Sequence, residues 1–147
     1  MTFRTPGLQP RERRPRHKGI YIGAPKCFAL QLACQQLAQA FDPDGGFGGC
    51  YVVGSALERP NWRDVDLVFI LDDASFAKLF PDVQGEAFEF DQRWLIMTVA
   101  ISAWLSSVSG LPIDFKFQPQ THANARHSGW RSAIGLRFAR KKKDEAD

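Results

Sequence analysis

The segment 51–73 (YVVGSALERPNWRDVDLVFILDD) constrains the fold of this 147-residue chain more than any other stretch. It opens on an apolar run, passes through Gly54-Ser55 and a polar stretch, and enters a longer apolar run at Asp64-Val65-Asp66. Apolar runs bounded by glycine and polar residues predict two strands joined by a tight turn and a loop. We expect the first strand at 50–53 and the second to begin at Asp64.

Three carboxylates are expected on one polar face of the resulting sheet. Side chains of a strand alternate between its faces, so Asp64 and Asp66 are expected on the same side, about 7 Å apart along the backbone. A later predicted strand places Asp114, Lys116 and Gln118 on one face and apolar residues on the other. Neighbouring carboxylates repel unless a cation lies between them, and Mg²⁺ prefers oxygen ligands of this kind. The pattern therefore predicts a divalent metal site.

An apolar strand, a Gly-Ser turn, a spacer, Asp-apolar-Asp and a third Asp on a strand together resemble the DNA polymerase beta-type nucleotidyltransferase superfamily. The matching residues are Val53-Gly54-Ser55, Asp64-Val65-Asp66-Leu67 and Asp114, and they span the middle half of the chain. The spacer, 56–63, is at the short end for that family. The resemblance implies an α/β (α+β) fold with a small mixed central β-sheet, helices packed on it and a nucleotidyltransferase-like core.

The resemblance also implies a reaction and its residues. Asp64, Asp66 and Asp114 would be the catalytic and metal-binding residues, holding two Mg²⁺ ions, with Mn²⁺ as a substitute. Gly54 and Ser55 would bind the β- and γ-phosphates of a nucleoside triphosphate such as ATP. A nucleoside monophosphate would pass to an acceptor hydroxyl on a small molecule, an RNA or a protein. Little chain remains for a separate acceptor domain, so a second copy or a partner subunit is expected to complete the acceptor site.

Two other functions remain open at this point. The chain could keep the nucleotidyltransferase fold yet bind nucleotide or nucleic acid without catalysis. It could also be a metal-dependent phosphoesterase, although such enzymes usually add histidines near the acids and none accompanies Asp64 or Asp66.

The basic residues are concentrated at the two ends of the chain, whose net charge is +3. Residues 1–18 and 137–147 together carry eleven basic and four acidic residues, whereas residues 19–136 carry eight basic and twelve acidic ones. We interpret 1–18 as a flexible basic arm, 19–136 as the nucleotidyltransferase-like domain and 137–147 as a charged tail. The acidic centre suits a metal site, and the basic ends suit contact with nucleic acid or serve solubility.

Composition points to an ordinary globular protein of the cytoplasm, since 44% of residues are apolar and 24% are charged. Cys27, Cys34 and Cys50 have neither metal-site spacing nor the even number of a disulfide framework, so we expect reduced thiols. No signal peptide is visible, and the longest apolar run, 94–105, is too short to cross a bilayer. We therefore expect no membrane partner.

Periodicity predicts the remaining elements. Helical spacing predicts an amphipathic helix at 26–41 and a buried helix that begins after Asp91 and is closed by Gly110. A run that is apolar on both faces, 67–71, predicts a central strand. We also expect a short helix at 76–80 and, from the alternation of Phe88 and Phe90, a brief strand.

Several polar residues are open to more than one interpretation. Lys116 can neutralise a phosphate or simply pair with an acid. His122 and His127 are spaced too poorly for a helical metal pair, so we expect polar surface residues. Asn124, Arg126 and Arg131 are candidates for lining a substrate pocket.

Overall fold

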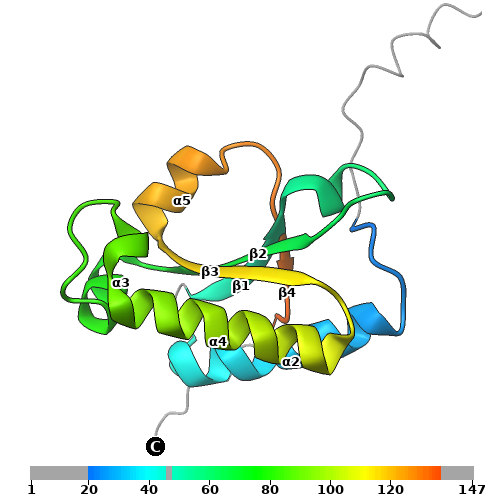
Figure 1. The fold of residues 1–147 in the computed structure, drawn as a ribbon, viewed down its shortest axis with the longest axis horizontal. Helices are drawn as coiled ribbons and strands as arrows, with labels where there is room; N and C mark the ends of the chain where they lie inside the picture. The colour runs from blue at the N-terminus through cyan, green and yellow to red at the C-terminus, as the bar shows by residue number, and fades with distance from the viewer. Residues whose placement is uncertain (1–19, 46–47, 137–147) are drawn as a thin grey trace, which may run out of the picture.

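The computed structural model describes residues 20–45 and 48–136, which form a four-stranded sheet with helices on both faces (Figure 1). The sheet order is β3-β2-β1-β4. β2 pairs antiparallel with β1 and parallel with β3, so the predicted mixed sheet and α+β class are confirmed. The predicted basic arm and charged tail lie outside the described residues. The strands are β1 (Gly49–Val53), β2 (Val65–Leu71), β3 (Ile113–Pro119) and β4 (Ser132–Ile134).

Two long helices cover one face of the sheet, and a short helix lies on the other (Figure 1). The long helices are α2 (Lys26–Phe41) and α4 (Gln92–Ser109), and the short one is α5 (Gln120–Arg126). The bounds of α2 are those that helical spacing predicts. α5 covers only part of its face, which we call the open face. Val53, Val68, Ile70 and Ala123 form a second, small cluster of buried residues there, whereas Asp66, Asp114 and Lys116 stay at least partly exposed.

The ends of α4 follow local capping rules. The Asp91 side chain accepts a hydrogen bond from the backbone N–H of Trp94 at 2.9 Å, which satisfies one of the free amides of the first turn. Gly110 ends the helix in the left-handed conformation, with φ 75°. The helix begins after Asp91 and ends directly before Gly110, so both predicted ends are confirmed.

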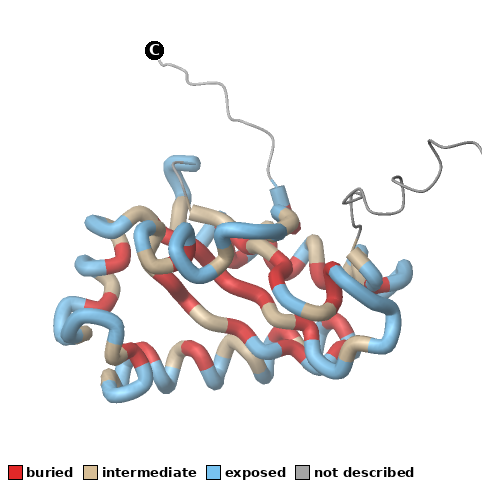
Figure 2. The backbone as a smooth tube through the Cα atoms, turned by 90° about the horizontal axis from the view of Figure 1, so that it is seen from above, coloured by how far each residue is buried: buried red, intermediate tan, exposed pale blue. Residues whose placement is uncertain are grey.

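The core lies between the sheet and the two long helices, and phenylalanines dominate it. Phe69 of β2 and Phe117 of β3 lie with ring centroids 5.7 Å apart, and Phe41 of α2 packs edge-on against both. β2 is buried at every position except Asp66, which confirms the predicted central strand. Figure 2 shows these buried strands running through the middle of the molecule. A carboxylate on the most buried strand is therefore the exception that needs an explanation.

β3 is an edge strand, and α4 satisfies its outer backbone groups. Ser106 Oγ accepts a hydrogen bond from the N–H of Ile113, and Ser102 Oγ accepts one from the N–H of Phe115, both at 3.0 Å. Trp94 Nε1 donates to the carbonyl of Phe117 at 3.0 Å. An unpaired strand edge invites pairing with other chains, so these side chains close β3 to further strands. They also attach β3 to α4.

Four predictions about the elements are wrong in part. β2 begins at Val65, so Asp64 lies just outside the strand. Phe88–Phe90 forms a 3-10 turn, η2, rather than a strand, because Phe88 turns inward to stack on Trp94. α3 spans Asp73–Leu79 and so begins three residues earlier than expected. α4 is not buried throughout, since Ile96 is 63% exposed.

None of the described helices is both long and apolar enough to cross a membrane. Cys34 and Cys50 are buried, Cys27 is half-buried, and all three are free thiols, as expected from their spacing.

Candidate functional site

The open face of the sheet carries two of the predicted carboxylates as direct neighbours. In the parallel pairing of β2 and β3, Asp66 lies opposite Asp114, and in the antiparallel pairing of β1 and β2 it lies opposite Val53. Adjacent strands are about 4.8 Å apart, and paired residues point to the same face. Val53, Asp66 and Asp114 thus form a row across three strands. The two acids are neighbours in this row although 48 positions separate them in the chain.

Gly54 follows β1 directly and lies against Asp66. Its φ is 78°, and a Cβ built on it would lie 2.5 Å from Asp66 Oδ2. A side chain at this position would therefore meet the carboxylate in a backbone conformation that L-residues rarely adopt. Ser55 follows in the 3-10 turn η1 (Gly54–Leu57) and is half-buried. Glycine is required here by the close approach of the acid as well as by the turn.

The surroundings of Asp66 disfavour the charged form of its carboxylate. Burial is the largest cause that raises the pKa of Asp66, and the neighbouring charge of Asp114 raises it further. Asp64 adds a smaller effect in the same direction, while Lys116 opposes it. Asp64 is exposed and precedes the strand, so strand alternation does not place it, yet its charge acts on the same centre. A bound cation would relieve this like-charge repulsion.

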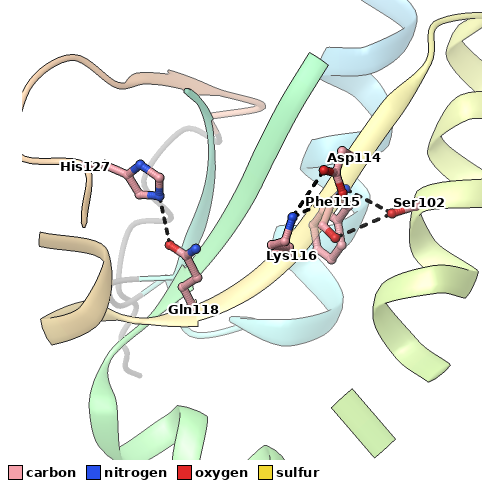
Figure 3. Close-up of polar contacts among 6 residues, drawn as sticks. All are labelled: Ser102, Asp114, Phe115, Lys116, Gln118 and His127. Carbon is pink, nitrogen blue, oxygen red and sulfur yellow. Dashed lines mark hydrogen bonds and ion pairs between the residues drawn. The ribbon is translucent and has the colours of Figure 1, made fainter. Parts of the chain in front are cut away.

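Lys116 pairs with Asp114, one of the two roles open from the sequence. Its Nζ lies 3.2 Å from Asp114 Oδ2 and 3.3 Å from Oδ1 (Figure 3). The two side chains are 44% and 48% exposed, and a pair this open to solvent contributes little stability. Asp114 can therefore leave Lys116 for another cation at small cost.

The residues present fit a divalent ion that keeps several non-protein ligands. In ranges 20–45 and 48–136, no group of three or more His, Cys, Asp or Glu side chains is arranged to hold a metal ion together. Asp66 and Asp114 nonetheless offer oxygen ligands side by side. Mg²⁺ is commonly bound by one or two carboxylates together with water and substrate phosphate oxygens. The donor set therefore suits Mg²⁺ that keeps several non-protein oxygen ligands better than a structural metal held by protein side chains alone.

Asp73, the acid at the start of α3, connects α3 to α5. Its carboxylate accepts hydrogen bonds from the backbone N–H of Thr121 at 3.0 Å and from the Thr121 hydroxyl. These bonds lower the pKa of Asp73. This carboxylate therefore caps the first turn of α5 rather than its own helix, α3.

Both histidines make specific contacts, so their prediction as plain surface residues is wrong. The side chain of His122 is only 15% exposed and lies 3.0 Å from Glu86 Oε2. His127 Nε2 lies 3.2 Å from Oε1 of the buried Gln118 (Figure 3). The alternation of β3 placed Gln118 on the polar face, but no local pattern indicated its partner.

Arg131 and Asn124, two of the three candidate pocket residues, lie together on this open side, and the third, Arg126, is exposed at the end of α5. Arg131 Nη2 donates to Asn124 Oδ1 at 3.0 Å, and the guanidinium lies over the ring of Tyr51, 5.2 Å from its centroid. Tyr51 is not among the site residues that the sequence predicts. The one local signal for its position on this face is its alternation with buried neighbours in β1.

No model of a known protein family matches this chain, and neither does any curated protein or any solved structure. The resemblance to nucleotidyltransferases therefore rests on the residues and their arrangement alone.

Proposed function

We propose that this protein is a Mg²⁺-dependent nucleotidyltransferase, which moves a nucleoside monophosphate from a nucleoside triphosphate to an acceptor hydroxyl. The observation that carries the proposal is the cross-strand pair of Asp66 and Asp114 beside a glycine that a side chain would obstruct. We also propose that a second copy or a partner subunit supplies part of the acceptor site, in the reducing cytoplasm that free thiols favour.

Each residue has a defined task in this proposal. Asp66 and Asp114 would hold Mg²⁺, with Asp64 contributing charge, and the ion would neutralise phosphate oxygens and favour ionisation of the acceptor hydroxyl. Gly54 lets a phosphate approach the backbone, and the Ser55 hydroxyl donates a hydrogen bond to it.

The reaction forms a bond between the acceptor oxygen and the α-phosphorus, and breaks the bond from that phosphorus to the leaving pyrophosphate. Asp114 would accept the hydroxyl proton as general base, which requires that it first leave Lys116.

Non-catalytic nucleotide binding is the second candidate, and the ion pair between Lys116 and Asp114 favours it. A lysine bound to the third acid neutralises a charge that a metal would otherwise neutralise. Turnover separates the two functions, because binding alone releases no pyrophosphate.

The test compares wild type with Asp66→Asn and the control Asp82→Asn. Residue 82 is an exposed acid beyond α3, at the opposite end of β2 from Asp66. Melting temperature is measured with each of the four ribonucleoside triphosphates, with and without Mg²⁺, together with pyrophosphate release. We expect Mg²⁺-dependent stabilisation by a triphosphate in wild type and Asp82→Asn, and its loss in Asp66→Asn. Equal responses from all three proteins would refute the assignment of the acids.

A further inference from the structure

A second cross-strand row lies next to the row of acids on the open face. Tyr51, Val68 and Lys116 are paired across β1, β2 and β3, two residues along each strand from Val53, Asp66 and Asp114. Two residues of a strand span about 7 Å. Val68 is buried, so a substrate that is bound at the acids and extends along the sheet would next meet Tyr51 and Lys116, the partly exposed ends of this row.

Arg131 covers the Tyr51 end of the second row. Cation–π contact with the ring and the hydrogen bond to Asn124 hold its guanidinium in place. Its Nη1 atom is buried and has no hydrogen-bond partner in the part of the chain that the structure describes. A guanidinium can donate five hydrogen bonds, and a buried donor without an acceptor is unfavourable. An acceptor on a ligand would complete it.

The surroundings of Arg131 are positively charged. The pKa of His127 is lowered, first by burial and then by Arg126, His122, Arg131 and Lys116. Two of these groups have acidic partners: Glu86 lies against His122, and Asp114 lies against Lys116. Among the described residues, Arg131 has no carboxylate partner, so an uncompensated cation faces the open side of the sheet.

We infer that Arg131 and Lys116 form a phosphate-binding subsite on the open face of the sheet, one cross-strand row from Asp66 and Asp114. Arg131 supplies the fixed fork that matches two phosphate oxygens, and Lys116 supplies a mobile positive charge. The assignment of this phosphate to the substrate rests on the proposed function, whereas the subsite itself does not. The phosphate can belong to the nucleotide or to a phosphorylated acceptor.

A purely structural role for Arg131 makes a different prediction. In that case its contacts with Tyr51 and Asn124 only attach the segment after α5 to the sheet, and removing the charge would lower stability without changing phosphate binding. The two roles are separated by measuring binding and melting on the same variants.

The experiment titrates the full-length protein with inorganic phosphate in the absence of Mg²⁺, by calorimetry and ³¹P NMR. Arg131→Gln removes the half-buried cation, and Arg93→Gln is the control, since Arg93 is exposed on α4, which covers the other face of the sheet. We expect Kd to rise about tenfold or more in Arg131→Gln, the effect of losing charge-assisted hydrogen bonds. For Arg93→Gln we expect a change below about threefold.

Lys116→Gln provides a second variant if Arg131→Gln does not fold, because Lys116 is half-exposed and contributes little to stability. It is expected to weaken phosphate binding by about threefold or more, as loss of a partly exposed charge does. Unchanged Kd in both variants, or no phosphate binding by wild type, would overturn the subsite.

Asp66→Asn distinguishes this proposal from the proposed function. It should keep phosphate binding, because it removes a negative neighbour, while it loses the Mg²⁺-dependent response to triphosphate. Competition then identifies the source of the phosphate. Displacement of inorganic phosphate by the Mg²⁺–triphosphate complex assigns the subsite to the nucleotide, and simultaneous binding assigns it to the acceptor.

Discussion

Replacing Gly54 by alanine should separate backbone strain from the contact with Asp66. The new Cβ has two effects in the folded state. At φ 78° it forces an L-residue into the left-handed region, which costs about 1–2 kcal/mol. It also lies 2.5 Å from Asp66 Oδ2, so the carboxylate must turn away, at about 0.5–1.5 kcal/mol for an off-rotamer side chain. The sum is about 1.5–3.5 kcal/mol.

Gly110→Ala is the matched control for the first effect. Its φ is 75°, and the nearest atom to its added Cβ is Lys26 Cε at 3.6 Å, an ordinary contact. Only the conformational cost of about 1–2 kcal/mol is expected there. In an Asp66→Ala background, Gly54→Ala should cost the same as Gly110→Ala, because the remaining Cβ of residue 66 lies 3.5 Å away.

A double-mutant cycle measures the coupling between Gly54 and Asp66. It compares urea unfolding of wild type, Gly54→Ala, Asp66→Ala and the double variant. We expect a coupling free energy of about 0.5–1.5 kcal/mol with unchanged m-values. Folded Gly54→Ala should also lose the Mg²⁺-dependent response to triphosphate, since its carboxylate has moved, while Gly110→Ala keeps it. A coupling of zero would refute the contact, and an unchanged nucleotide response would refute its functional importance.

Three further changes test the packing and the charge of the sheet. Gly135→Ala should destabilise more than Gly110→Ala by about 1–3 kcal/mol in urea unfolding, because its Cβ would lie 2.9 Å from the α2 backbone, which cannot rotate away. Trp94→Phe should cost about 1–3 kcal/mol by leaving the carbonyl of Phe117 unpaired, and Trp104→Phe, 37% exposed in wild type, should cost less. Asp66→Asn should be more stable than wild type at pH 7 without Mg²⁺. Because the pKa of Asp66 is raised in the folded protein, wild type loses stability as the pH rises above the unfolded pKa near 3.8. The difference in unfolding free energy between Asp66→Asn and wild type should therefore shrink as the pH is lowered towards 3.8. A difference that does not change with pH would contradict this prediction.

Local pattern was sufficient where an element depends on its own residues. The spacing of apolar residues predicted both bounds of α2, and the alternation of β3 separated the buried Phe115 and Phe117 from the exposed Asp114. It was insufficient at Phe88–Phe90, where alternation resembles a strand but the ring of Phe88 packs on Trp94. That contact depends on a neighbour in the next helix, which periodicity does not register.

The sequence by itself determined the main helix, the central strand and the types of residue available for chemistry, which depend on side-chain periodicity and turn chemistry within a few residues. The mixed class of the fold was implied by the resemblance that its motifs carry. Only the tertiary structure decided that Asp66 and Asp114 are cross-strand partners, that Asp64 lies outside the strand, and that Arg131 covers Tyr51. Strand register and loop placement depend on pairing between segments far apart in the chain, and that pairing is set by the packing of the whole sheet against its helices.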